Sequence, residues 1–208
     1  MSDAFGSQVA NVKGLLLAAV VLLLSGCAAT RPVTLSYPPA DERDVVPEPA
    51  AEQDASSATS LVLEVFDART EKSRLAVTGD WLNPEAVKYV AKNDVQAWVR
   101  DAFESELSKA GVSVTTQQAL DGGALLPHLT VDIQRLDCNL GWAYDADVWL
   151  QVTLEHPGEA PLVRQYQGRG SAGLNLAGTT GAVGKSLALA LRDAIRQMRA
   201  EVDMARRL

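Results

Sequence analysis

Two stretches near the middle of the chain decide its fold: residues 129–134, LTVDIQ, and residues 148–155, VWLQVTLE. In both, an apolar side chain alternates with a polar one, which is the period of a β-strand with one buried face and one open face. The short links in this part of the chain favour antiparallel pairing. The centre of the fold is therefore predicted to be a sheet that is buried on one side.

Further strands are predicted on either side of this centre. Residues 61–66, LVLEVF, form a β-rich run that places Leu61, Leu63 and Val65 on one face. Residues 112–115 are long enough for a short strand, and the turn at residues 156–158, HPG, is followed by a returning strand at residues 163–168. The sheet is thus expected to gain strands both before and after the central pair.

Two helices are predicted from apolar residues at helical spacing. Residues 83–85, NPE, combine a cap, a proline and an acid and indicate a helix start, and an apolar stripe then runs from Val95 to Ala110 until Gly111 ends it. The last helix carries its apolar stripe at Leu187, Leu191, Ala194, Ile195, Met198 and Val202. Its lead-in, residues 178–186, is rich in glycine and threonine, so Thr180 or Ser186 is expected to cap it.

The order of these elements predicts an α+β domain over residues 60–208, with a mainly antiparallel sheet and both helices packed on one face. The other face should be polar and partly open. It is expected to carry Asp132, Gln134, Trp149, Gln151 and Thr153.

The N-terminus has the features of an export signal. Residues 14–24, GLLLAAVVLLL, follow Lys13 and are about half the roughly 20 residues that a membrane-spanning helix needs. Residues 24–28, LSGCA, resemble the bacterial lipobox, which implies that residues 1–26 are removed and that Cys27 is acylated. Several acyl chains anchor a protein firmly. In such lipoproteins an aspartate after the cysteine favours the inner membrane, so Ala28 implies the outer membrane, with the domain facing the periplasm.

Residues 27–59 are predicted to be a disordered, lipid-anchored linker. They contain Pro32, Pro38, Pro39, Pro47 and Pro49 among many small and acidic residues, and they show neither helical nor strand periodicity.

Composition and the scarcity of reactive residues argue against several functions. A net charge of -7 and a pI near 4.9 leave no basic stripe for nucleic acid. His128 and His156 are the two histidines, and neither has the neighbours of a catalytic triad, so we expect no catalytic residues, no cofactor and no enzyme activity. Asp137, Asp145 and Asp147 are interpreted as solvated acids rather than metal ligands.

Two glycine-rich motifs and one cysteine need separate interpretation. Residues 168–173, GRGSAG, and residues 178–186 resemble phosphate-binding loops, but the first comes too late for a βαβ unit and the second has the wrong spacing. Cys138 is either a buried, inert thiol or the donor of an intermolecular disulfide.

Residues 141–149, GWAYDADVW, are the predicted partner-binding surface because aromatic and acidic side chains alternate there. The candidate contact residues are Trp142, Tyr144, Asp145, Asp147 and Trp149. Trp149 should point away from the helices, opposite Val148 and Leu150. The alternative is that Trp142 and Tyr144 fold back and cover the edge of the sheet.

Together with the lipobox and the closing helix, residues 65–70, VFDART, and residues 106–112, ELSKAGV, resemble the YajG-like lipoproteins of Gram-negative bacteria. This resemblance implies an outer-membrane lipoprotein with no assigned biochemical role and no catalytic residues. The order of elements is also similar to that of lipoproteins that assist lipopolysaccharide assembly or lipid transport. We therefore expect a non-enzymatic protein that binds an envelope protein or a lipid, or assists envelope assembly, with a periplasmic hydrolase as the rival class.

Overall fold

The computed structural model describes residues 29–37, 59–78, 87–115, 126–174 and 180–207. The predicted signal peptide and Cys27 lie outside these residues. The strands are β1 (Ala29–Val33), β2 (Thr59–Asp67), β3 (Arg74–Thr78), β4 (Val87–Ala91), β5 (Val112–Thr115), β6 (His128–Leu140), β7 (Ala143–Glu155) and β8 (Leu162–Leu174). The helices are α2 (Val95–Lys109) and α3 (Thr180–Arg207).

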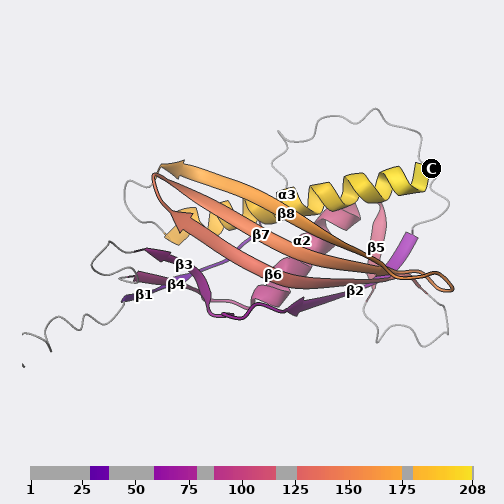
Figure 1. Ribbon diagram of the computed structural model, residues 1–208, viewed down its shortest axis with the longest axis horizontal. Helices are drawn as coiled ribbons and strands as arrows, with labels where there is room; N and C mark the ends of the chain where they lie inside the picture. Colours follow the sequence, from indigo (N-terminus) through magenta and orange to yellow (C-terminus); the bar gives the residue numbers. More distant parts are fainter. Residues whose placement is uncertain (1–28, 38–58, 79–86, 116–125, 175–179, 208) are drawn as a thin grey trace, which may run out of the picture.

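The eight strands form one curled, mixed sheet, and both helices pack on the same side of it (Figure 1). The antiparallel pairs are β3 with β4, β6 with β7 and β7 with β8. The parallel pairs are β1 with β4, β2 with β5, β2 with β6 and β3 with β6. The α+β class is confirmed, but the expectation of a mainly antiparallel sheet is wrong, because β2 runs parallel to both β5 and β6 and because that expectation lacked β1, β3 and β4.

β6 is the strand around which the sheet is organised. One of its edges pairs with β7 from His128 to Leu140. The other edge pairs first with β2 and then, further along, with β3, and both run parallel to it. β2 and β3 therefore lie end to end along the same edge of β6. The loop between Asp67 and Arg74 connects them. β6 has a bulge at the same level, between Ile133 and Arg135.

Helix α2 forms where its apolar stripe indicated. The Asp94 side chain caps it by accepting hydrogen bonds from the backbone N–H groups of Gln96 and Ala97, and the left-handed Gly111, at a φ of 74°, follows its end. Residues 83–85, where the sequence indicated a helix start, lie outside the described residues. Val87 begins strand β4 rather than a helix, and Tyr89 of this strand is buried in the core.

Helix α3 lies directly on β8, and two glycines make this contact possible. A Cβ on Gly168 would lie 1.9 Å from the carbonyl oxygen of Ala190, and one on Gly170 would lie 2.3 Å from that of Ser186. The helix residues at this contact are small and recur every four positions, so the backbones of helix and strand touch. The GRGSAG motif is therefore a packing device in β8, and Thr180 rather than Ser186 starts the helix.

Residues 29–37, called the N-terminal segment below, belong to the folded domain. β1 pairs with β4 along its length, and Val33 and Leu35 are buried in the core beneath α3. Of the linker expected over residues 27–59, residues 29–37 are instead part of the folded domain, since Ala29–Val33 is a strand; residues 27, 28 and 38–58 lie outside the described residues. Val33, Leu35 and Tyr37 alternate with polar residues, a strand pattern that the prolines obscured.

Candidate functional site

A buried ion pair between Asp67 and Arg69 stabilises the loop that connects β2 to β3. The Arg69 guanidinium donates from Nε to Asp67 Oδ1 and from Nη2 to Asp67 Oδ2, each at 2.8 Å. The same guanidinium donates to the backbone carbonyls of Lys72 at 2.6 Å and of Arg74 at 3.2 Å. Arg69 thus joins the Asp67 side chain to the backbone of residues further along the loop. The spacing of the Asp-x-Arg motif places the two side chains close enough for this ion pair.

Electrostatics keep the Asp67 carboxyl ionised in this loop. Burial alone would raise the pKa of Asp67, but the hydrogen bonds and the charge of Arg69 outweigh burial and hold that pKa below its usual value. The side chains of the pair are only 4% and 9% exposed, so water screens their attraction little.

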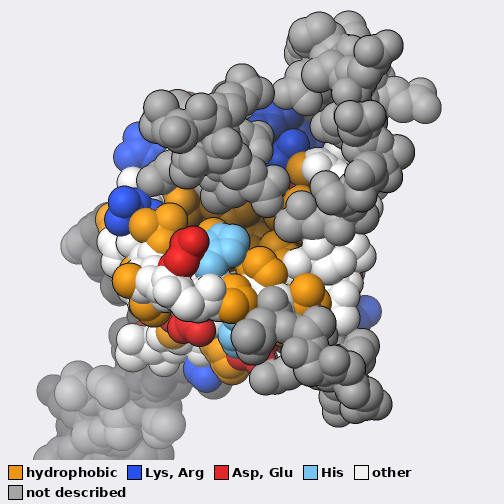
Figure 2. Space-filling model, turned by 90° about the vertical axis from the view of Figure 1, so that its right-hand side faces the viewer, with side chains coloured by type: hydrophobic (Ala, Val, Ile, Leu, Met, Phe, Trp, Pro, Cys, Tyr) orange, Lys and Arg blue, Asp and Glu red, His pale blue; other side chains and the backbone are white. Residues whose placement is uncertain are grey.

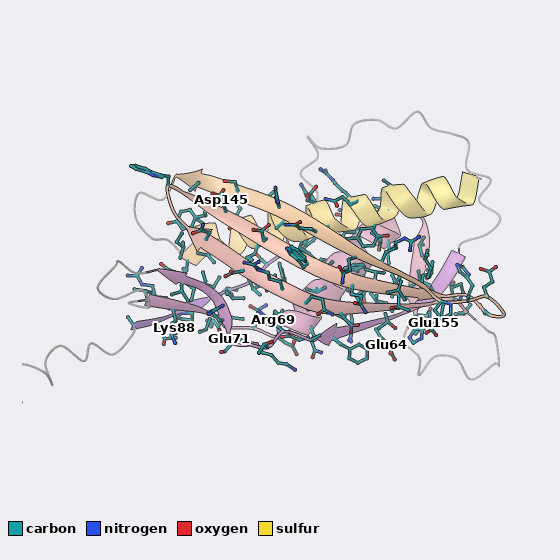
Figure 3. The ribbon with its side chains drawn as sticks, viewed as in Figure 1. Glu64, Arg69, Glu71, Lys88, Asp145 and Glu155 are labelled. Carbon is teal, nitrogen blue, oxygen red and sulfur yellow. The ribbon has the colours of Figure 1, made fainter. Side chains whose placement is uncertain are left out.

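A shallow pocket of about 330 Å³ opens beside this loop, between it and the bulged part of β6. Its charged walls are already paired: Arg74 lies 2.9 Å from Glu71, and Arg135 lies 3.2 Å from Asp137. Arg69 and Glu71 lie together below β6 (Figure 3). Because its charges are compensated internally, the pocket offers little net charge to a ligand.

A second buried cluster fastens the N-terminal segment to both helices. Glu106 of α2 is 5% exposed and accepts a hydrogen bond from the Tyr37 hydroxyl at 2.9 Å. Lys109 Nζ lies 2.6 Å from its Oε1 and Arg199 Nη1 of α3 lies 3.7 Å from its Oε2. Asn93 adds two hydrogen bonds to the backbone of Leu35, at 2.8 and 3.0 Å.

The charges of this cluster depend on one another. Burial would raise the pKa of Glu106, but hydrogen bonds from Lys109 and Tyr37 outweigh it and leave that pKa below its usual value. Burial and the Glu106 carboxylate together raise the pKa of the Tyr37 phenol, which stays a neutral donor. Sequence reasoning missed this cluster because Tyr37 lay in the expected linker.

The structure divides the predicted partner-binding surface. Trp142 is 94% exposed at the tip of the β6–β7 hairpin, whereas Tyr144 is 2% exposed and packs in the core. Tyr144 is therefore not a surface contact residue, because it occupies an inward position of β7. Trp149 is 39% exposed between the buried Val148 and Leu150, as the alternation predicted.

Asp145 and Asp147, the acidic members of that surface, lie beside β8. They border a second hollow of about 330 Å³ together with Arg169 and Ser171. Asp147 Oδ1 lies 3.5 Å from Arg169 Nε and accepts a hydrogen bond from Gln167 Nε2 at 3.1 Å. The predicted partner-binding residues are thus spread along β7, with Trp142 at the hairpin tip and Trp149 about 24 Å further along the strand.

The two histidines lie at the opposite end of the sheet, where β6 begins and β7 ends. Figure 2 shows this end, with hydrophobic side chains beside histidine and acidic ones. His128 Nε2 is 3.4 Å from Glu64 Oε2. In the described parts of the chain, no group of three or more His, Cys, Asp or Glu could hold a metal ion.

Cys138 is a buried thiol on the inner face of β6. It is 1% exposed, and its Sγ lies 3.3 Å from Ser186 Oγ of α3. Burial raises the pKa of this thiol to about 11, so it stays protonated near neutral pH. This environment supports the inert thiol rather than the intermolecular disulfide.

The fold and these clusters define the class of protein. It is an α+β domain with a curled mixed sheet and two helices on one face, and the buried Arg69 and Glu106 form ion pairs with neighbouring residues of the same chain. Within the described residues, no helix is long and apolar enough to span a membrane.

A solved structure with a TM-score above 0.5 supports this fold. The domain is similar to protein XCC0632 from Xanthomonas campestris, of the family model DUF330, with a TM-score of 0.51 and 14% identity over 84% of this chain and 94% of that one. Lipoprotein GNA1162 from Neisseria meningitidis aligns with a TM-score of 0.35 and 11% identity over 73% of this chain and 100% of that one. No family model and no curated protein matches the sequence, so the resemblance to YajG-like lipoproteins stays a prediction.

Proposed function

We propose that the protein is a lipoprotein of the bacterial outer membrane that is acylated at Cys27 and whose domain serves as a non-enzymatic binding or assembly protein of the cell envelope. The observation that carries the proposed anchor is the lipobox-like sequence LSGCA at residues 24–28, and the position of β1 sets what such an anchor would do. Its first residue, Ala29, comes two positions after Cys27, and β1 is hydrogen-bonded into the sheet. A lipid on Cys27 would therefore hold the whole folded domain at the membrane surface.

The chemistry of the interior supports binding rather than catalysis. The most deeply buried charged groups, Arg69 and Glu106, are engaged by neighbouring groups of the same chain. Such groups stabilise the loops that they join, and they are not poised to transfer protons or to attack a substrate. We also propose that the protein is a YajG-like lipoprotein. Its Asp-x-Arg-Thr motif then has a structural role.

Mass spectrometry of the N-terminal peptide tests the anchor. The full chain is expressed in a Gram-negative host, extracted from the membranes and analysed beside the variants Cys27→Ser and Cys138→Ser. We expect a mature N-terminus at Cys27 that carries acyl chains, in the wild type and in Cys138→Ser alike, and its loss in Cys27→Ser. An unmodified mature N-terminus at any other residue would refute the proposal.

A further inference from the structure

The strand register places the start of β1 and the tip of the β6–β7 hairpin at the same end of the sheet. Ala29 of β1 pairs with Val87 of β4, and Val87 pairs with Thr78 of β3. Since Val77 pairs with Asn139, Thr78 comes level with Leu140, the last residue of β6. One row across the sheet thus runs from the first residue of β1 to the last residue of β6.

Cys27 and Trp142 each lie two positions beyond this row in the sequence. Two residues of chain reach about 7 Å at most, so a lipid-bearing Cys27 stays close to this end of the sheet. Three strand spacings of about 4.8 Å each separate β1 from β6. Figure 3 shows the same arrangement, with Lys88 of β4 and Asp145 beside the hairpin at one end and Glu155 at the other.

Trp142 is an unusual residue for a hairpin tip. With 94% of its surface exposed, it is the most exposed of the large hydrophobic side chains in the described chain. An indole in water forgoes the free energy of burying its apolar ring, and tryptophan is enriched where a membrane meets water because the ring can be buried while its N–H remains wet. The acyl chains on Cys27 would bring a bilayer to this end of the sheet.

We propose that Trp142 inserts into the headgroup region of the bilayer that holds the lipid on Cys27. This inference rests on the proposed function. The domain then has two points of contact with the membrane, the acylated N-terminus and the hairpin tip. Asp145 lies back from the tip on β7 and is exposed, so it faces the water above the headgroups.

Two contacts at one end also orient the molecule. β6 has 13 residues and so extends about 43 Å along the sheet. With its hairpin tip in the bilayer, the sheet stands away from the membrane. The end that carries His128, Glu155 and the β7–β8 turn then points into the periplasm.

Quenching of tryptophan fluorescence in vesicles tests the insertion. The full chain is expressed in a Gram-negative host, and the membrane-extracted protein is reconstituted into phosphatidylcholine vesicles with and without a phospholipid that carries bromine near the headgroup end of its acyl chains. The chain contains four tryptophans, so the variants Trp142→Phe and Trp149→Phe are compared with the wild type to test whether Trp142 is the residue that the lipid quenches. Trp149 is the matched control because it is also exposed but lies far from the tip. The mass of the N-terminal peptide is measured on the same samples.

We expect acylated protein whose emission is quenched by the brominated lipid, with this quenching lost in Trp142→Phe and kept in Trp149→Phe. If the protein is acylated but Trp142→Phe is quenched as strongly as the wild type, the insertion is refuted and the proposed function stands; a protein partner at the tip would give this result. If Cys27 is not acylated, the proposed function fails and this inference fails with it.

Discussion

At the scale of single residues, the Asp67–Arg69 pair does more than join two charges. Arg69 also ties the carbonyls of Lys72 and Arg74, so a single guanidinium holds the loop between two strands that run along the same edge of β6. A lysine has one ammonium and cannot bind the carboxylate through two parallel hydrogen bonds while it also reaches both carbonyls.

Arg69→Lys is therefore expected to lower the free energy of unfolding by about 2 kcal/mol, because buried hydrogen bonds to charged groups are lost while the charge is kept. Urea unfolding followed by circular dichroism measures this loss. Arg135→Lys is the matched control, since its ion pair with Asp137 is exposed, and it should change the free energy by less than about 0.5 kcal/mol. Equal effects of the two substitutions would show that the buried loop does not depend on Arg69.

Acid should remove the contribution of Asp67. Its pKa in the folded protein lies below the unfolded value of 3.8, so its stabilising effect is present above that value and is lost as the pH falls through the folded pKa. Asp67→Asn leaves the buried Arg69 charge unpaired and should cost about 3 kcal/mol at neutral pH. This difference from the wild type should shrink below about pH 4 in urea titrations, whereas Asp137→Asn should differ little from the wild type throughout. A deficit for Asp67→Asn that is independent of pH would contradict this role.

At the scale of elements, the contact between α3 and β8 depends on the absence of side chains at two positions of the strand. Gly168→Ala would place a Cβ 1.9 Å from the Ala190 carbonyl oxygen, so helix and strand would have to separate. We expect a loss of about 3 kcal/mol in the free energy of unfolding, measured by thermal or urea denaturation. Gly141→Ala, where an added Cβ meets nothing within 4 Å, should be close to neutral. A stable Gly168→Ala protein would mean that the helix does not lie where the structure places it.

β6, its neighbours β2 and β7, and both helices could be predicted because their apolar residues repeat with a clear period. The β7 alternation correctly placed Trp149 on the open face, and the apolar stripe of α2 correctly ended before Gly111. β1 was hidden because Pro32 interrupts a five-residue strand at the end of the sheet order. β4 follows a helix-like start at residues 83–85, and local sequence does not show that Val87–Ala91 pairs with two other strands.

The candidate sites were less predictable than the fold for a related reason. Tyr144 and Trp142 are similar residues two positions apart, and their different exposure depends on where β7 begins. The roles of Tyr37 and Glu106 depend on a contact between segments 69 positions apart in the sequence. Pairings of this kind are set by topology, and topology was the part of the fold that the periodicity did not determine.

At the scale of the whole molecule, the fold bears on the proposed anchor, because the position of β1 sets how far a lipid on Cys27 would hold the domain from the bilayer. A flexible tether over residues 28–59 would separate them by an average of about 30 Å. The structure instead includes Ala29 in the sheet and fastens the residues that follow it through Asn93 and Glu106. A lipid on Cys27 would thus act on the domain itself.

Neutron reflectometry of the acylated protein in a supported bilayer measures this distance directly. We expect protein density to begin at the headgroup layer, with no layer of water between the bilayer and the domain. As a control, a flexible glycine and serine segment inserted between Ala28 and Ala29 should create such a layer. A water layer of about 30 Å beneath the unmodified domain would contradict the proposal that β1 holds the domain at the membrane surface.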